Sequence, residues 1–134
     1  MDQGVKKSIL IIDDFEESVE IMQERLVRQG YDVMVAYDGE NGLEMASEKK
    51  PDLILLDIML PRMDGWEVLE KLKKDEGVSS IPVIYMTAYT TIQYEGERKR
   101  AMQAGAADFL KKPFDLDELV RKINDCIRGD SNPN

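Results

Sequence analysis

The 134-residue chain contains no histidine and a single cysteine, Cys126. Without histidine, Ser-His-Asp triads, Cys/His zinc sites and a phosphohistidine within this chain are excluded, so any chemistry has to use Asp, Glu, Thr, Lys or the backbone. One cysteine cannot form an internal disulfide, which favours a reducing, cytoplasmic setting. No apolar run is long enough for a membrane span, and the N-terminal MDQGVKKS lacks the apolar segment of a signal peptide, so membrane insertion is not expected.

Basic residues are fewer than acidic ones, and the chain has a net charge of −9. An acidic chain is poorly suited to non-specific binding of nucleic acid, so no direct nucleic-acid contact is expected. The length suits one domain with a core of its own. We expect this domain to cover residues 1–130 and to be followed by a polar C-terminal tail over residues 131–134.

Strand and helix signals alternate along the chain. Short apolar runs predict five strands, which lie at residues 9–12, 31–37, 53–56, 81–86 and 108–111. Apolar residues at helical spacing predict the helices between them, as for Phe15, Val19, Met22 and Leu26. Five βα units predict an α/β fold of the three-layer, flavodoxin-like (βα)5 type, with a five-stranded parallel sheet in the order 2-1-3-4-5.

The connection after the fourth strand is unusually long and polar. Its sequence, YTTIQYEGERKR over residues 89–100, carries no apolar stripe. We interpret it as mainly a loop, with a weak helix only from about Arg98 to Gln103. A segment that contacts a partner protein is the alternative interpretation.

Polar residues stand at the carboxyl ends of four predicted strands. Asp13 and Asp14 follow the first strand, Asp57 the third, Thr87 the fourth and Lys112 the fifth. A parallel sheet brings these ends to one edge, where ligands bind. Neighbouring carboxylates raise one another's pKa unless a cation neutralises them, and Mg²⁺ prefers carboxylate oxygens. The pattern therefore predicts a Mg²⁺ site faced by a hydroxyl and an ammonium group, which suits a phosphoryl group and an aspartyl nucleophile.

Each of these residues also has an ordinary interpretation when it is taken alone. Asp14 could cap the first helix, Thr87 could be a strand-end hydroxyl, and Lys112 could be a solvated charge. Their combination, with each residue at the end of the appropriate strand, favours the phosphoryl site. Trp66 and Cys126 are interpreted as packing residues.

Four motifs together resemble the response-regulator receiver domain, of the kind seen in single-domain chemotaxis regulators. They are ILIIDD, PDLILLDIMLPRMDGWEVL, IPVIYMTAY and AGAADFLKKPF, and the similarity extends from about Ser8 to Arg128. The resemblance implies a two-component signalling switch rather than an enzyme. It implies that Asp57 accepts a phosphoryl group from a phosphohistidine on a sensor histidine kinase or a histidine phosphotransfer protein.

The resemblance also implies roles for the residues around Asp57. Asp13 and Asp14 match the acidic pair that binds Mg²⁺ together with Asp57 and the backbone carbonyl of Met59. Thr87 matches the switch hydroxyl, and Lys112 matches the lysine that pairs with the phosphoryl group. The remaining assignments are space for the phosphoryl group at Ala88, the switch aromatic at Phe109, and tuning of the phosphate lifetime by Met59 and Tyr89.

By the same resemblance, phosphorylation draws Thr87 and Lys112 toward Asp57, and Phe109 moves inward. This movement changes the face made by the fourth helix, the fifth strand and the fifth helix, which contacts a downstream protein.

Three other functions remain open. The first is a receiver fragment of a larger regulator that carries a DNA-binding or enzymatic output domain. The second is a Mg²⁺-dependent phosphatase that forms an aspartyl phosphate; it is disfavoured because Ile58 and Met59 follow Asp57 in place of a D-x-D motif. The third, a receiver that binds partners without phosphorylation, is disfavoured by the complete set of site residues.

Overall fold

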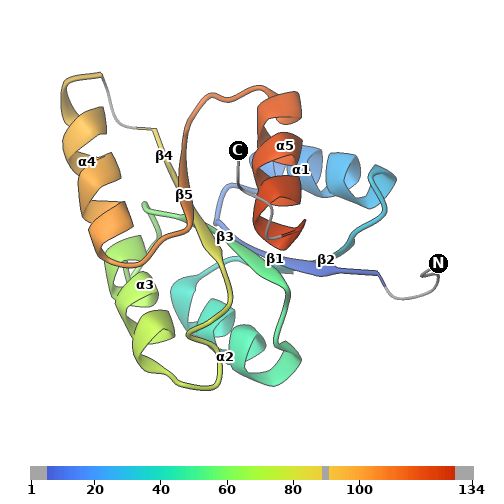
Figure 1. The fold of residues 1–134 in the computed structure, drawn as a ribbon, viewed down its shortest axis with the longest axis horizontal. Coiled ribbons are helices and arrows are strands. Elements are labelled where there is room, and N and C mark those ends of the chain that lie inside the picture. Colours follow the sequence, from blue (N-terminus) through green and yellow to red (C-terminus); the bar gives the residue numbers. More distant parts are fainter. Residues whose placement is uncertain (1–5, 89–90, 129–134) are drawn as a thin grey trace.

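The computed structural model of the protein describes residues 6–88 and 91–128. A five-stranded parallel sheet in the order β2-β1-β3-β4-β5 lies between two layers of helices (Figure 1). The strands are β1 (Ser8–Ile12), β2 (Asp32–Ala36), β3 (Leu53–Asp57), β4 (Val83–Thr87) and β5 (Asp108–Lys111). The helices are α1 (Glu16–Arg28), α2 (Gly39–Lys49), α3 (Gly65–Lys74), α4 (Thr91–Gln103) and α5 (Leu116–Arg128). The predicted fold class and strand order are confirmed.

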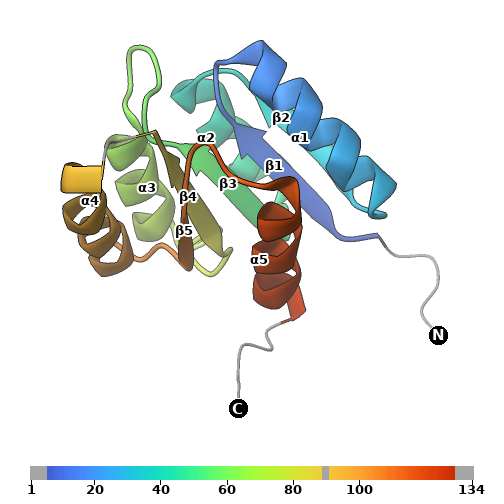
Figure 2. The ribbon, with the colours of Figure 1, turned by 90° about the horizontal axis from the view of Figure 1, so that it is seen from above.

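The sheet has a separate core on each face, because successive strand residues point to opposite sides. Ile9 and Ile11 of β1 pack with the apolar sides of α1 and α5. Leu10 and Ile12 of the same strand pack with α2 and α3 on the other face, where Ala101 of α4 joins them. The two helix layers are seen on opposite sides of the sheet in Figure 2. Burial on both faces explains why the strands are apolar without alternation.

Local hydrogen bonds fix where two of the helices begin. The Asp38 side chain accepts from the backbone N–H of Asn41 and caps α2, and Asp64 caps α3 by accepting from Glu67. The residue before α1 is Phe15, and no side chain caps that helix. The interpretation of Asp14 as a cap is therefore wrong.

The fourth helix differs from our expectation. It runs from Thr91 to Gln103, so most of the segment that we interpret as a loop is helical. Among the side chains described in this helix, those of residues 95–103, only Ala101 is fully buried. The segment lacks the apolar stripe that reveals a helix, although Glu, Arg, Lys, Gln, Met and Ala all have high helix propensity.

Tyr89, expected to tune the phosphate lifetime, and the expected polar tail over residues 131–134 lie outside the described residues.

Among the helices that are described, none is both long enough and apolar enough to cross a membrane.

Candidate functional site

Three carboxylates meet at the carboxyl edge of the sheet. Asp57 is the last residue of β3, and Asp13 follows the adjacent strand β1, held there by its backbone N–H, which donates to the Ala36 carbonyl. One ligand oxygen from each of Asp13, Asp14 and Asp57 lies within 4.8 Å of the other two. Asp13 and Asp57 are buried, whereas Asp14 is exposed. The structure thus brings the three predicted carboxylates into one cluster.

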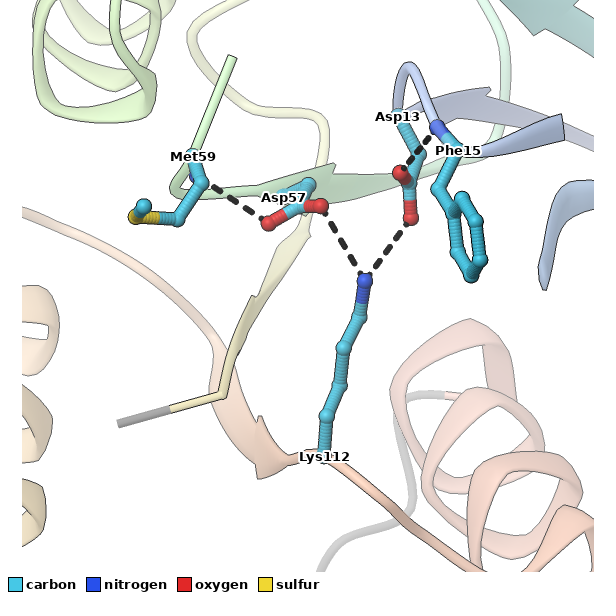
Figure 3. A network of polar contacts seen from close by, with 5 residues as sticks. All are labelled: Asp13, Phe15, Asp57, Met59 and Lys112. Atoms are coloured by element: carbon cyan, nitrogen blue, oxygen red, sulfur yellow. Dashed lines mark hydrogen bonds and ion pairs between the residues drawn. The ribbon is translucent and has the colours of Figure 1, made fainter. Parts of the chain in front are cut away.

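Lys112 bridges the two buried carboxylates (Figure 3). Its Nζ lies 3.0 Å from Asp13 Oδ2 and 3.0 Å from Asp57 Oδ2. The second oxygen of each aspartate accepts a backbone N–H: Phe15 donates to Asp13 Oδ1, and Met59 donates to Asp57 Oδ1, both at 3.0 Å. Both carboxylates are therefore held in defined orientations.

The site is short of positive charge, because one ammonium group faces three carboxylates. Burial and the Asp13 carboxylate raise the pKa of Asp57 from 3.8 to about 6, against the opposing influence of Lys112 and the Met59 N–H. Burial also opposes the charge on Lys112, but Asp57 and Asp13 outweigh this and raise the pKa of the ammonium group. Carboxylate oxygens with a charge deficit of this kind suit a hard divalent cation such as Mg²⁺.

Thr87 and Ala88 lie on the side of the site formed by β4. Thr87 is fully buried at the end of that strand, and its carbonyl accepts from the Lys112 N–H at 2.6 Å. The preceding residue, Met86, pairs with Asp57 in the sheet, so Thr87 lies beside the carboxylate cluster. Ala88 is exposed and lines, with Phe15 and Lys112, a groove with a volume of about 420 Å³.

Phe109 lies inside the core, with 2% of its surface exposed. Its ring meets that of Tyr85 edge to face, with centroids 6.2 Å apart. The ring thus lies in the inward position that we expect it to reach on phosphorylation, and a movement into that position stays a prediction. Met59, the other residue expected beside Asp57, has its backbone at the site and an exposed side chain.

Two features of the site are missed by sequence reasoning. Phe15, which we assign to the inner stripe of the first helix, precedes α1 and is 57% exposed. The backbone N–H groups of Phe15 and Met59 hold the aspartates, and no side-chain pattern signals such bonds. Each donor lies two residues after its aspartate, which is the spacing of an Asx turn.

Comparison with known proteins identifies the family. Residues 9–124 match the sequence model of the response regulator receiver domain. The chain is 40% identical over 120 residues to the DNA-binding dual master transcriptional regulator RpaA of a Synechocystis strain, covering 90% of this chain and 48% of that protein. It is equally similar to the response regulator PleD of Caulobacter vibrioides, with 40% identity over 120 residues covering 90% of this chain and 26% of that protein. The chain thus spans about half the length, or less, of these curated relatives.

A solved structure agrees with this assignment. The receiver domain of the sensor histidine kinase PA1611 from Pseudomonas aeruginosa, determined with a magnesium ion coordinated in its active-site cleft, superimposes with a TM-score of 0.83 at 30% identity. The match covers 92% of this chain and 99% of that one. The chain therefore belongs to the response regulator receiver domain family of two-component signalling.

Proposed function

We propose that this regulatory domain is a phosphorylation-dependent switch in which Asp57 accepts a phosphoryl group. The donor is a phosphohistidine on a sensor histidine kinase or on a histidine phosphotransfer protein. The observation that carries the proposal is the setting of Asp57, whose buried carboxylate lies 3.0 Å from the Lys112 ammonium within a cluster of three carboxylates. We place the exchange in the cytoplasm, where Cys126 remains a free thiol.

The transfer step follows from the position of Asp57. A carboxylate oxygen attacks phosphorus, the phosphorus–nitrogen bond of the donor breaks, and its electron pair remains on the imidazole nitrogen. With a pKa of about 6, most of the Asp57 carboxyl is ionised at neutral pH and can act as the nucleophile. Lys112, already 3.0 Å from Asp57 Oδ2, is placed to donate to the oxygens of the incoming group.

The metal site is part of the same proposal. The residues that would hold Mg²⁺ are Asp13, Asp14 and Asp57, whose carboxylates cluster. The backbone carbonyl of Met59 is the further ligand that the family resemblance implies. When bound, Mg²⁺ neutralises negative charge on the carboxylates and on the phosphoryl oxygens. The deficit of positive charge around Asp57 supports this assignment, because Lys112 alone leaves the cluster with excess negative charge.

The response to phosphorylation runs through β4 and β5. The phosphoryl group adds roughly −1.5 to −2 charges, which draw the Thr87 hydroxyl and Lys112 toward Asp57. Ala88 leaves space for the group, and the ring of Phe109 moves to the inward arrangement that it has in this structure. The face made by α4, β5 and α5 carries the signal to a downstream protein. Exposed Met59, together with Tyr89, sets the access of water and hence the lifetime of the phosphoryl group.

The decisive experiment incubates the purified protein with Mg²⁺ and a small phosphodonor or beryllofluoride. Intact mass and fluorine NMR should show one adduct, which is absent in Asp57→Asn. Asp32→Asn is a matched control, because Asp32 is exposed at the start of β2, at the opposite edge of the sheet. An adduct that persists at normal yield in Asp57→Asn would show that Asp57 is not the acceptor.

A second context is supported by the lengths of the relatives. RpaA and PleD extend well beyond the part matched by this chain, so the domain also fits as the receiver of a longer regulator with an output domain. The intact mass of the natural protein, or the reading frame of its gene, distinguishes the two. In both contexts the reaction at Asp57 is the same.

A further inference from the structure

Trp66 is the only tryptophan of the chain, and its ring lies between two other elements. It is the second residue of α3, and the guanidinium carbon of Arg100 in α4 lies 3.9 Å from its ring centroid. On β4, the Tyr85 ring meets it edge to face, with centroids 4.6 Å apart. The helices α3 and α4 lie side by side in both ribbon views (Figures 1 and 2). Trp66 therefore joins the surface of α4 to the interior of the sheet.

Tyr85 connects Trp66 to Phe109, the expected switch aromatic. The Tyr85 ring is fully buried and also meets the Phe109 ring edge to face, with centroids 6.2 Å apart and an interplanar angle of 86°. Arg100, Trp66, Tyr85 and Phe109 thus form a continuous series of contacts from an exposed position on α4 to β5. Because packed interiors transmit strain, a change at one ring of this series affects the next.

A second connection links Trp66 to the phosphoacceptor through the backbone. Its neighbour Gly65 donates its N–H to the Ile58 carbonyl at 3.0 Å. A Cβ atom at Gly65 would lie 2.5 Å from Ile58 Cα and 2.7 Å from the Asp57 carbonyl oxygen, so this close approach requires glycine. The start of α3 is therefore in direct contact with the peptide unit of Asp57, and a displacement of either one moves the other.

Trp66 lines two surface grooves, one beside the carboxylate site and one between α3 and α4. One groove, with a volume of about 610 Å³, is lined by Trp66 together with Asp14 and Met59 of the carboxylate site. Another, of about 550 Å³, is lined by Trp66 together with Arg100 and Lys73 between α3 and α4. The indole ring is a shared wall of both grooves.

Within α4, the structure describes the side chains of residues 95–103, and of these only Ala101 is fully buried. In this part of the helix, the cation–π contact of Arg100 with Trp66 is a further contact that holds α4 against α3.

We propose that Trp66 and Arg100 are positioning residues that couple α4 to the phosphorylation of Asp57. Their contact stabilises the arrangement in which Phe109 lies inside, and so favours the phosphorylated form over the free one. The inference rests on the proposed function, since it concerns the phosphoryl group on Asp57. Coupling is reciprocal, so a phosphoryl group that favours this arrangement also strengthens the hold of α3 on α4.

The experiment titrates beryllofluoride, with Mg²⁺ present, into wild type, Arg100→Gln, Trp66→Leu and the double variant. We expect each single substitution to weaken binding by about two- to fivefold, the range of a cation–π contact at an exposed site. The double variant should bind no more weakly than Trp66→Leu alone, because that substitution already removes the contact. Trp66→Phe, which keeps an aromatic face for Arg100, should recover part of the affinity.

Arg98→Gln is the matched control. It makes the same substitution on the same helix, at an exposed residue two positions earlier and so on a different side of α4. It should bind beryllofluoride like wild type. Because Arg100 is itself exposed, Arg100→Gln should remain folded, which circular dichroism and thermal unfolding verify.

Two results would overturn the coupling. One is an Arg100→Gln variant that binds like Arg98→Gln, even with a lowered melting temperature, since a packing role alone changes only stability. The other is a double variant whose loss of beryllofluoride affinity equals the product of the losses in the two single variants.

The same titration separates the coupling from the proposed function. If wild type forms no adduct, or Asp57→Asn forms one, the proposed function fails and the coupling fails with it. An adduct at Asp57 with unchanged variants leaves the function intact and removes only the coupling.

Discussion

Replacing Asp57 by asparagine should make the metal-free protein more stable at about pH 8, although it removes the proposed phosphoacceptor. The reason is the cost of holding that carboxylate charged in a buried position beside Asp13. Its pKa rises from 3.8 to about 6 on folding. Asparagine has nearly the same shape, carries no charge, and still offers a carbonyl oxygen to the Met59 N–H that binds Asp57 Oδ1.

The size of the effect follows from the change in pKa. At a pH above both pKa values, this difference in pKa corresponds to about 3 kcal/mol of unfolding free energy, because a pKa difference of one corresponds to about 1.36 kcal/mol. Relaxation of the site around asparagine reduces the gain, and we expect an increase of about 1–3 kcal/mol in the free energy of unfolding. For a chain of this length, that is a rise of roughly 4–10 °C in melting temperature.

The pH dependence gives the prediction its sign. A carboxyl whose pKa is raised on folding destabilises the folded state above that pKa and costs nothing below the unfolded value. The advantage of Asp57→Asn should therefore be complete above about pH 6, shrink as the pH falls, and vanish near pH 3.8. Urea unfolding in a chelator across this range measures it. An Asp57→Asn variant that is equally or less stable at alkaline pH, or a gain independent of pH, would refute the electrostatic reasoning.

Three more predictions concern the same edge of the sheet. Mg²⁺ at tenfold its Kd should stabilise wild type by about 1.4 kcal/mol and Asp57→Asn by much less; equal melting-temperature shifts would contradict the assigned ligand. Lys112→Met should cost about 3–5 kcal/mol in urea unfolding without metal, because it leaves two buried carboxylates without their cation. Gly65→Ala should cost about 1–3 kcal/mol and reduce phosphorylation, because its Cβ would overlap Ile58. The control Gly96→Ala, with open space around the new Cβ, should be neutral or stabilising in the same assays.

The sheet and its edge are predictable because the physical signals are local. A run such as Leu53–Leu56 is apolar throughout because both of its sides face a helix layer, and Asp57 stands where that run ends. Parallel topology then places Asp57 beside Asp13 without any knowledge of side-chain contacts. The apolar runs predict the fold class, and the parallel strand order then predicts which site residues lie together.

Other features depend on contacts between distant segments, and sequence patterns do not reveal these. The start of α4 carries no apolar stripe, and Arg100 contacts Trp66 only after α3 and α4 have packed. Phe15 falls on the spacing of the α1 stripe, yet it lies before the helix begins and its side chain is exposed. Trp66 is a packing residue, as interpreted, but its neighbours on both sides are visible only in the folded chain.

The backbone bonds to the two buried aspartates have a consequence for how the site can vary. Phe15 and Met59 hold Asp13 and Asp57 through their N–H groups, so any residue except proline can supply the same bond. Their side chains are 57% and 61% exposed and are not required for that geometry. The reaction centre and its rim are therefore separable: the rim can be exchanged to suit a different donor or a different phosphate lifetime while the acceptor stays in place.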